Sequence, residues 1–187
     1  MHRLSFMLVI AVFVSACGSQ GDLPAYVKTV AAHGEPTQVF WGDTHLHTSY
    51  SPDAYFFGNT TADPDTAYRY AKGLPVVHPH TRGKIQIHTP LDFLVVADHA
   101  EMMGVPLRLF QGDERLTKTA TGRRFMKMID AGKNQDVFFE FITAINNNEP
   151  FEDLANEDIQ RSVWSDSVAI TERHNEPGTF TSFIGWE

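Results

Sequence analysis

Histidine and carboxylate side chains gather at three separate points of the sequence. His45 and His47 stand two residues apart, Asp98 and His99 are adjacent, and Glu187 follows an apolar stretch. Side chains two apart on a β-strand leave the same face, so the two histidines of the first motif could bind one ion. Imidazole and carboxylate ligands together suit Zn, Mn or Fe. The pattern therefore predicts a site for divalent metal ions.

Two further carboxylates flank the histidine pair. Asp43 would point to the same face of a strand as the pair, where it could orient a ligand histidine from behind. Asp53 lies in the polar segment that follows. We assign Asp53 and Asp98 as the catalytic carboxylates. The expected metal ligands are His45, His47, His99 and Glu187.

Strand-like and helix-like segments alternate along the chain, and each motif stands at the end of a strand-like one. Bulky apolar residues predict buried strands at 39–47, 91–97 and 180–186. Capping residues and helical spacing predict helices at 63–73, 101–110, 122–131 and 156–174. The segment 136–147 is apolar enough to lie inside. This alternation predicts an α/β fold with a largely parallel sheet or barrel, whose active site would lie at the carboxyl ends of the strands.

The composition excludes several classes of protein. The chain has 187 residues, with 15 Lys and Arg against 23 Asp and Glu, a net charge of −8 and one cysteine. The acidic balance argues against a nucleic-acid partner, because nucleic-acid binders usually carry a basic face. One cysteine also excludes an internal disulfide and a zinc site built from several cysteines. The length is that of one domain or part of a larger one.

The first residues have the pattern of an export signal. A positive start at 1–3 precedes an apolar stretch at 4–14. That stretch is shorter than the roughly 18–20 residues that a membrane-spanning helix needs. The sequence Val-Ser-Ala-Cys that follows resembles the lipobox of bacterial lipoproteins, in which the cysteine, here Cys17, is lipidated.

This resemblance implies a signal peptide at 1–16 and a polar tether at 17–38. The protein would be exported and held in the bacterial cell envelope by a lipid anchor. Gly18 and Ser19 follow the cysteine in place of an aspartate, which favours the outer membrane, facing the periplasm. The alternatives are a plain signal peptide cut near Ala16 and an uncleaved anchor.

Three stretches, FWGDTHLHTSYSPDA, PLDFLVVADHAEMMG and FIGWE, carry a His-x-His strand, an Asp-His strand end and a Gly-x-Glu strand end in that order. In this combination the chain resembles the PHP superfamily, named for polymerase and histidinol phosphatase. Within it, the chain is most similar to the bacterial branch known as domain of unknown function 3604. The resemblance spans residues 39–187.

The resemblance implies a distorted β/α barrel with two or three divalent metal ions and hydrolysis of a small-molecule phosphoester. By motif, His45 and His47 would hold the first metal, and Glu187 would bridge two metals. His99 would hold another, with Asp98 beside it. Asp53 falls near a position at which relatives have a histidine or an aspartate.

The chain departs from the superfamily after the glutamate. Relatives supply further histidines and an aspartate–histidine pair downstream, so residues 39–187 would be the N-terminal part of an incomplete barrel. Such a part is expected to leave a sheet edge and apolar surface exposed.

Three functions follow from this pattern. The first is an exported metal-dependent phosphoesterase, of which this chain would be a truncated piece without activity of its own. The second is a metallohydrolase that cleaves another ester or an amide, since metal-activated water is not confined to phosphate. The third is a non-catalytic truncated lipoprotein.

Four other histidines are expected to have structural roles and not to bind metal. His78 and His80 form a second His-x-His pair between prolines, which is typical of a mobile loop. His88 precedes a strand, at the wrong end for the site. His174 continues the apolar stripe of its predicted helix and is expected to pack.

Overall fold

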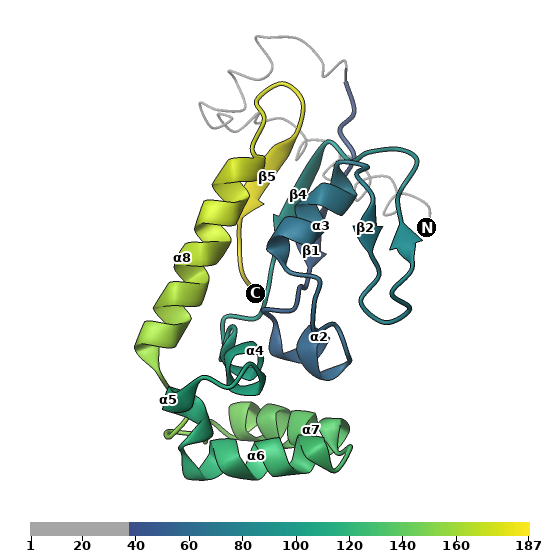
Figure 1. The fold of residues 1–187 in the computed structure, drawn as a ribbon. Helices are drawn as coiled ribbons and strands as arrows, with labels where there is room; N and C mark the ends of the chain where they lie inside the picture. The colour runs from purple at the N-terminus through teal and green to yellow at the C-terminus, as the bar shows by residue number, and fades with distance from the viewer. Residues whose placement is uncertain (1–37) are drawn as a thin grey trace, which may run out of the picture. The chain divides into compact units, whose positions relative to one another are not determined.

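The computed structural model of the protein describes residues 38–187 (Figure 1). The expected signal peptide, Cys17 and the expected tether up to residue 37 lie outside the described residues. Among the helices of the described part, none is long and apolar enough to cross a membrane.

A parallel sheet of three strands forms the centre of the domain. It consists of β1 (Gly42–Leu46), β4 (Phe93–Val96) and β5 (Thr181–Ile184), in the order β1-β4-β5. Each strand lies within a segment predicted to be extended, but it is shorter than that segment. The α/β fold and the parallel sheet are confirmed. Over the described residues the sheet is open, so the expected PHP-type barrel is not confirmed.

Two helices cover one face of the sheet. These are α3 (Pro64–Ala71) and α8 (Glu157–His174), which Figure 1 shows running beside the strands. Asp63 caps α3 by accepting a hydrogen bond from the Thr66 N–H, and Asn156 caps α8 in the same way. The two predicted helix starts are therefore confirmed. The buried residues of this layer are Ala67, Tyr68, Ala71, Leu94, Val96, Ile170 and Phe180.

The other face of the sheet carries apolar side chains. Phe93, Val95, Phe183 and Ile184 line a shallow cavity of about 590 Å³ there, and no described helix covers it. Phe183 and Ile184 are both exposed. The expected exposure of apolar sheet surface is therefore confirmed for the described residues.

A second group of helices lies beyond the carboxyl ends of the strands (Figure 1). Its members are α2 (Pro52–Phe56), α4 (Val105–Phe110), α5 (Glu114–Thr117), α6 (Ala120–Asp130) and α7 (Asn134–Asn146). Phe56, Phe125 and Phe141 form the aromatic centre of their core. The helix predicted from residue 101 begins at Val105 instead. Pro106 lies in its first turn, where a missing N–H costs nothing.

Two local elements differ from the sequence predictions. The segment 136–147 is a helix, α7, that buries Val137 and Phe141 but leaves Phe139 61% exposed, so it lies at the surface and not inside. A short antiparallel hairpin of β2 (Val76–Val77) and β3 (Lys84–Ile85) was not predicted. Two-residue strands carry too little pattern to be recognised from sequence.

Gly104 joins the sheet to the second group of helices and allows a direct test of the packing. Its φ of +69° is left-handed, and a Cβ there would lie 2.6 Å from a methyl of Val163 on α8. We expect Gly104→Ala to lower the free energy of unfolding by about 2–4 kcal/mol, from backbone strain plus overpacking.

Gly112→Ala is the matched control in urea denaturation. Gly112 has a similar φ of +88°, but nothing lies within 4 Å of its added Cβ, so only strain of about 1 kcal/mol is expected. Equal losses in the two variants would contradict the packing of α4 against α8.

Candidate metal centre

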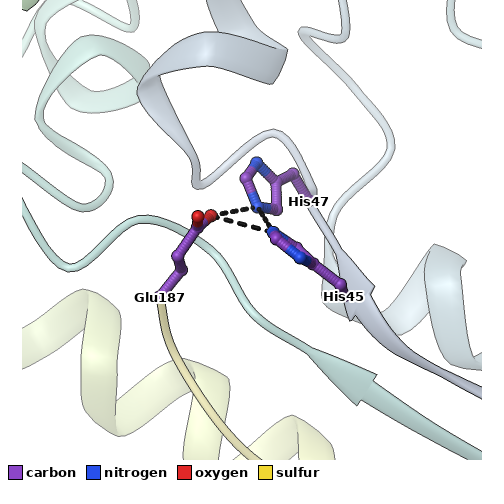
Figure 2. A group of neighbouring side chains, drawn as sticks. All are labelled: His45, His47 and Glu187. Carbon is purple, nitrogen blue, oxygen red and sulfur yellow. Dashed lines mark hydrogen bonds and ion pairs between the residues drawn. The ribbon is translucent and has the colours of Figure 1, made fainter.

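Three side chains converge where β1 and β5 end. Figure 2 shows His45, His47 and Glu187 pointing toward one another. The Nε2 atoms of the two histidines are 3.1 Å apart. Glu187 Oε2 lies 2.9 Å from His45 Nε2 and 2.8 Å from His47 Nε2. Residues 142 positions apart in sequence thus meet because parallel strands end at the same edge of the sheet.

His99, just after β4, completes the group. Its Nδ1 atom lies 3.6 Å from Glu187 Oε2, and its ring packs edge-on against that of His47. On the far side, Asp53 Oδ2 lies 2.8 Å from His47 Nδ1 and 3.5 Å from His99 Nε2. All four expected ligands and Asp53 therefore share one site. We call these five residues, His45, His47, Asp53, His99 and Glu187, the metal centre.

Asp98 lies beneath the metal centre and contacts Thr48. It is 1% exposed, and its two oxygens accept hydrogen bonds from the Thr48 N–H at 2.5 Å and the Thr48 hydroxyl at 2.7 Å. Burial raises the pKa of Asp98 to about 6, although the Thr48 hydrogen bonds act in the opposite direction. This placement suits a residue that positions the loop after His47. Both side-chain hydrogen bonds of Asp98 are to Thr48, and its assignment as a catalytic carboxylate stays a prediction.

Ser51 is a residue that sequence reasoning missed. Its hydroxyl donates to Asp53 Oδ1 at 2.6 Å and accepts from the His99 N–H at 3.2 Å, so it ties two residues of the metal centre together. Partial burial raises the pKa of Asp53, but hydrogen bonds from Ser51, His47 and the Ala54 N–H outweigh it. The net pKa of Asp53 lies below its usual range, so the side chain is a carboxylate at neutral pH.

Glu187 is ionised and fixed by its backbone. The hydrogen bond to His45 lowers the pKa of Glu187, despite an opposing effect of burial. Its N–H donates to the Asp98 carbonyl, and its own carbonyl accepts from the Ala100 N–H at 3.0 Å. These two bonds continue the β4–β5 pairing past the ends of the strands and hold the carboxylate over His99.

Asp43 does not contact a histidine side chain, as it would have to in order to orient a metal ligand. Its carboxylate accepts a hydrogen bond from the backbone N–H of His45 at 2.9 Å, and it makes no hydrogen bond to an imidazole. The register of the β1–β4 pairing shifts between Asp43 and Leu46. Such an irregularity changes the direction of side chains along a strand, so alternation alone could not place Asp43.

The other histidines among residues 38–187 lie outside the metal centre. His78 Nδ1 accepts from the N–H groups of His80 and Thr81, so this second pair closes the turn between β2 and β3. His88 is exposed. The packing role predicted for His174 is confirmed, because its ring stacks on Tyr68 and its Nε2 lies 2.9 Å from Asp65.

The comparisons with known proteins identify a family without an assigned activity. Residues 34–187 match the model of the family described as "Protein of unknown function (DUF3604)". The chain belongs to the DUF3604 family. No curated protein and no solved structure matches the chain. The match confirms the predicted resemblance to domain of unknown function 3604.

The metal centre of the DUF3604 domain has a donor set that suits a divalent ion. A metal ion about 2.0–2.1 Å from each of its ligands places neighbouring ligand atoms about 3.3 Å apart. The observed separations among His45, His47 and Glu187 are 2.8–3.1 Å, close to that value. In two overlapping groups, each residue offers one ligand atom, and the atoms lie within 4.8 Å of one another; the groups are His45, His47 and Glu187, and His47, Asp53 and His99. Neutral imidazoles and ionised carboxylates are suitable ligands for Zn, Mn or Fe.

Proposed function

We propose that the DUF3604 domain belongs to a metal-dependent hydrolase that acts on phosphoesters. The observation that carries the proposal is the convergence of three histidines from two strand ends on one carboxylate oxygen, Glu187 Oε2. Three imidazoles and a carboxylate oxygen around one point form a donor set that suits a divalent cation. The same edge of a parallel sheet is where α/β enzymes bind their ligands.

His47 belongs to both groups of donors, but as a neutral imidazole it can bind only one metal ion. One neutral imidazole offers a single lone pair, and His47 Nδ1 lies 2.8 Å from Asp53. With Nδ1–H donated to Asp53, Nε2 faces His45 and Glu187. We therefore assign the first ion to His45, His47 and Glu187. A second ion would be held by His99 Nε2 and Asp53, on the side of the His99 ring away from Glu187.

The chain's own residues prepare the site for this chemistry. When bound, divalent ions would neutralise phosphate oxygens and make water more acidic at neutral pH. Asp53 fixes the ring of His47 and selects its tautomer. Ser51 holds Asp53, and Asp98 holds the Thr48 loop that follows His47. These contacts hold the donors in position, which would lower the cost of ordering them when an ion binds.

Three further parts of the proposal go beyond the described domain. We place the DUF3604 family in the PHP superfamily on the order of its three motifs, with a distorted β/α barrel as the complete fold. Export and a lipid anchor at Cys17 in the cell envelope are proposed from residues 1–17. The substrate is proposed to be a small molecule and not a nucleic acid, in keeping with the acidic net charge.

A panel of chromogenic esters tests the proposed reaction. The purified full-length protein is loaded with Zn or Mn and assayed on phosphate monoesters and diesters, a phosphonate, a sulfate ester, a carboxylic ester and an amide. We expect turnover of at least one phosphate ester, loss of that turnover with a chelator, and its return when metal is added. His45→Ala should abolish it, because His45 belongs to the first donor group.

The same panel separates the other two functions. Chelator-sensitive turnover confined to the sulfate ester, the carboxylic ester or the amide would show a metallohydrolase with a different substrate. Bound metal without turnover of any ester, and no change in His45→Ala, would show a protein that binds metal but does not catalyse hydrolysis. Either result would overturn the proposed phosphoesterase.

A further inference from the structure

A cavity of about 570 Å³ opens beside the metal centre. Its volume lies within the range of about 300–1,000 Å³ that is usual for small-molecule sites. The residues that line it are Ala100, Met103, Glu157, Gln160, Arg161, Trp164 and Trp186. None of them belongs to the metal centre.

The cavity and the metal centre share a wall. Ala100 directly follows His99, and Trp186 directly precedes Glu187. The Ala100 N–H donates to the Glu187 carbonyl at 3.0 Å, so these two segments lie side by side. The cavity therefore lies next to the backbone that carries Glu187 and His99.

One face of α8 supplies the rest of the lining. Glu157, Gln160, Arg161 and Trp164 follow the helical spacing of three and four residues, which places them in one stripe. The buried face of α8, with Ile159 and Val163, is a different stripe and packs into the core. Trp164 is partly buried and also packs against this core, whereas Glu157 and Arg161 are exposed.

Two tryptophans form a corner in the wall of this cavity. The rings of Trp164 and Trp186 meet at 86° with their centroids 5.6 Å apart. Trp186 is 63% exposed, although it comes directly before a residue of the metal centre. Gln160, Glu157 and Arg161 add polar groups to the lining, and the charged groups of the last two lie 3.8 Å apart. Aromatic walls of this kind bind the faces and edges of other rings, and the polar groups make the cavity unsuited to a long alkyl chain.

We infer that the cavity binds the aromatic group of the substrate, so that the substrates are phosphate esters of aromatic alcohols. The inference rests on the proposed function. The phosphate would lie at the metal centre and the aromatic alcohol in the cavity. Water would supply the new oxygen on phosphorus, the phosphorus–oxygen bond to the alcohol would break, and the alcohol would leave carrying a proton from that water.

Two non-hydrolysable phosphonates test the inference by calorimetric titration of the zinc-loaded protein. Phenylphosphonate carries the ring and methylphosphonate does not, while both present the same charged group. We expect phenylphosphonate to bind at least about tenfold more tightly, a difference that an aromatic contact can provide. Trp164→Ala should reduce that preference to within about twofold and leave the affinity for methylphosphonate unchanged. Trp41→Ala, which removes an exposed tryptophan that does not line the cavity, should preserve it.

The possible results separate the inference from the proposed function. Equal affinities for the two phosphonates would overturn the inference and leave the phosphoesterase proposal standing. Binding of zinc but of neither phosphonate would overturn both. If Trp164→Ala does not fold, as judged by circular dichroism, Trp186→Ala removes the other, largely exposed wall. A tenfold preference that persists in every folded variant of this wall would overturn the inference.

Discussion

Replacing His47 with alanine is expected to lower the affinity of the protein for zinc or manganese by about 100-fold or more. His47 contacts every other member of the metal centre, at 2.8 Å from both Glu187 and Asp53, 3.1 Å from His45, and edge-on to His99. Its loss removes one donor and releases the carboxylates that it holds. Loss of a supporting residue alone typically costs about 10–100-fold, so a ligand should cost at least as much. Chelator competition gives the affinity, and elemental analysis gives the metal content.

Two histidine variants serve as controls for this result. His45→Ala removes a side chain that is 61% exposed and that contacts only His47 and Glu187 within the metal centre, so a smaller loss is expected. His88→Ala removes an exposed histidine elsewhere and should leave the metal content unchanged. Unchanged affinity in His47→Ala, or equal losses in all three variants, would contradict the assignment of the ligands.

Replacing Asp98 with alanine is expected to lower the free energy of unfolding by about 2–4 kcal/mol at pH 7. The substitution removes two hydrogen bonds to a charged group and leaves the buried Thr48 N–H without its partner. Asp98→Asn keeps the size of the side chain and one acceptor oxygen, so it should cost less. Urea denaturation of the metal-free protein measures both. If alanine is tolerated as well as asparagine, Asp98 does not hold the Thr48 loop.

The pH dependence of the same proteins provides an independent check. Burial raises the pKa of Asp98 in the folded protein to about 6, above its ordinary value of 3.8. The folded state therefore binds more protons than the unfolded state between about pH 4 and pH 6, and this contribution to stability is lost as the pH rises through that window. About two pKa units correspond to roughly 3 kcal/mol. The metal-free wild type should show this loss, and Asp98→Asn should not.

The sequence predicted which residues would lie together because each motif stands next to a strand with a strong apolar pattern. Val95 and Val96 mark β4 clearly, so the position of His99 at its carboxyl end followed directly. The parallel sheet then brings Glu187 to the same edge without any pattern that links it to His45. Long-range convergence of this kind follows from topology, and topology was predictable from the alternation of segments.

The supporting residues were less predictable because their partners depend on loop geometry. Ser51 and Thr48 are ordinary loop residues in the sequence, and only the folded loop brings their hydroxyls to Asp53 and Asp98. The adjacent Ser-Pro-Asp was the one available signal, since serine before a helix start often bonds to nearby groups. The prediction that the segment 136–147 lies inside the protein was wrong for a different reason. Its apolar residues outnumber those that the small helical core can cover.

Anomalous X-ray diffraction from crystals of the protein grown with zinc or manganese tests the central claim most directly. We predict one strong peak in contact with His45 Nε2, His47 Nε2 and Glu187, and a second in contact with His99 and Asp53. Data collected on both sides of the absorption edge identify the element at each peak. Peaks found only elsewhere on the molecule, or none at saturating metal, would contradict the proposal that these residues form the centre of a metal-dependent hydrolase.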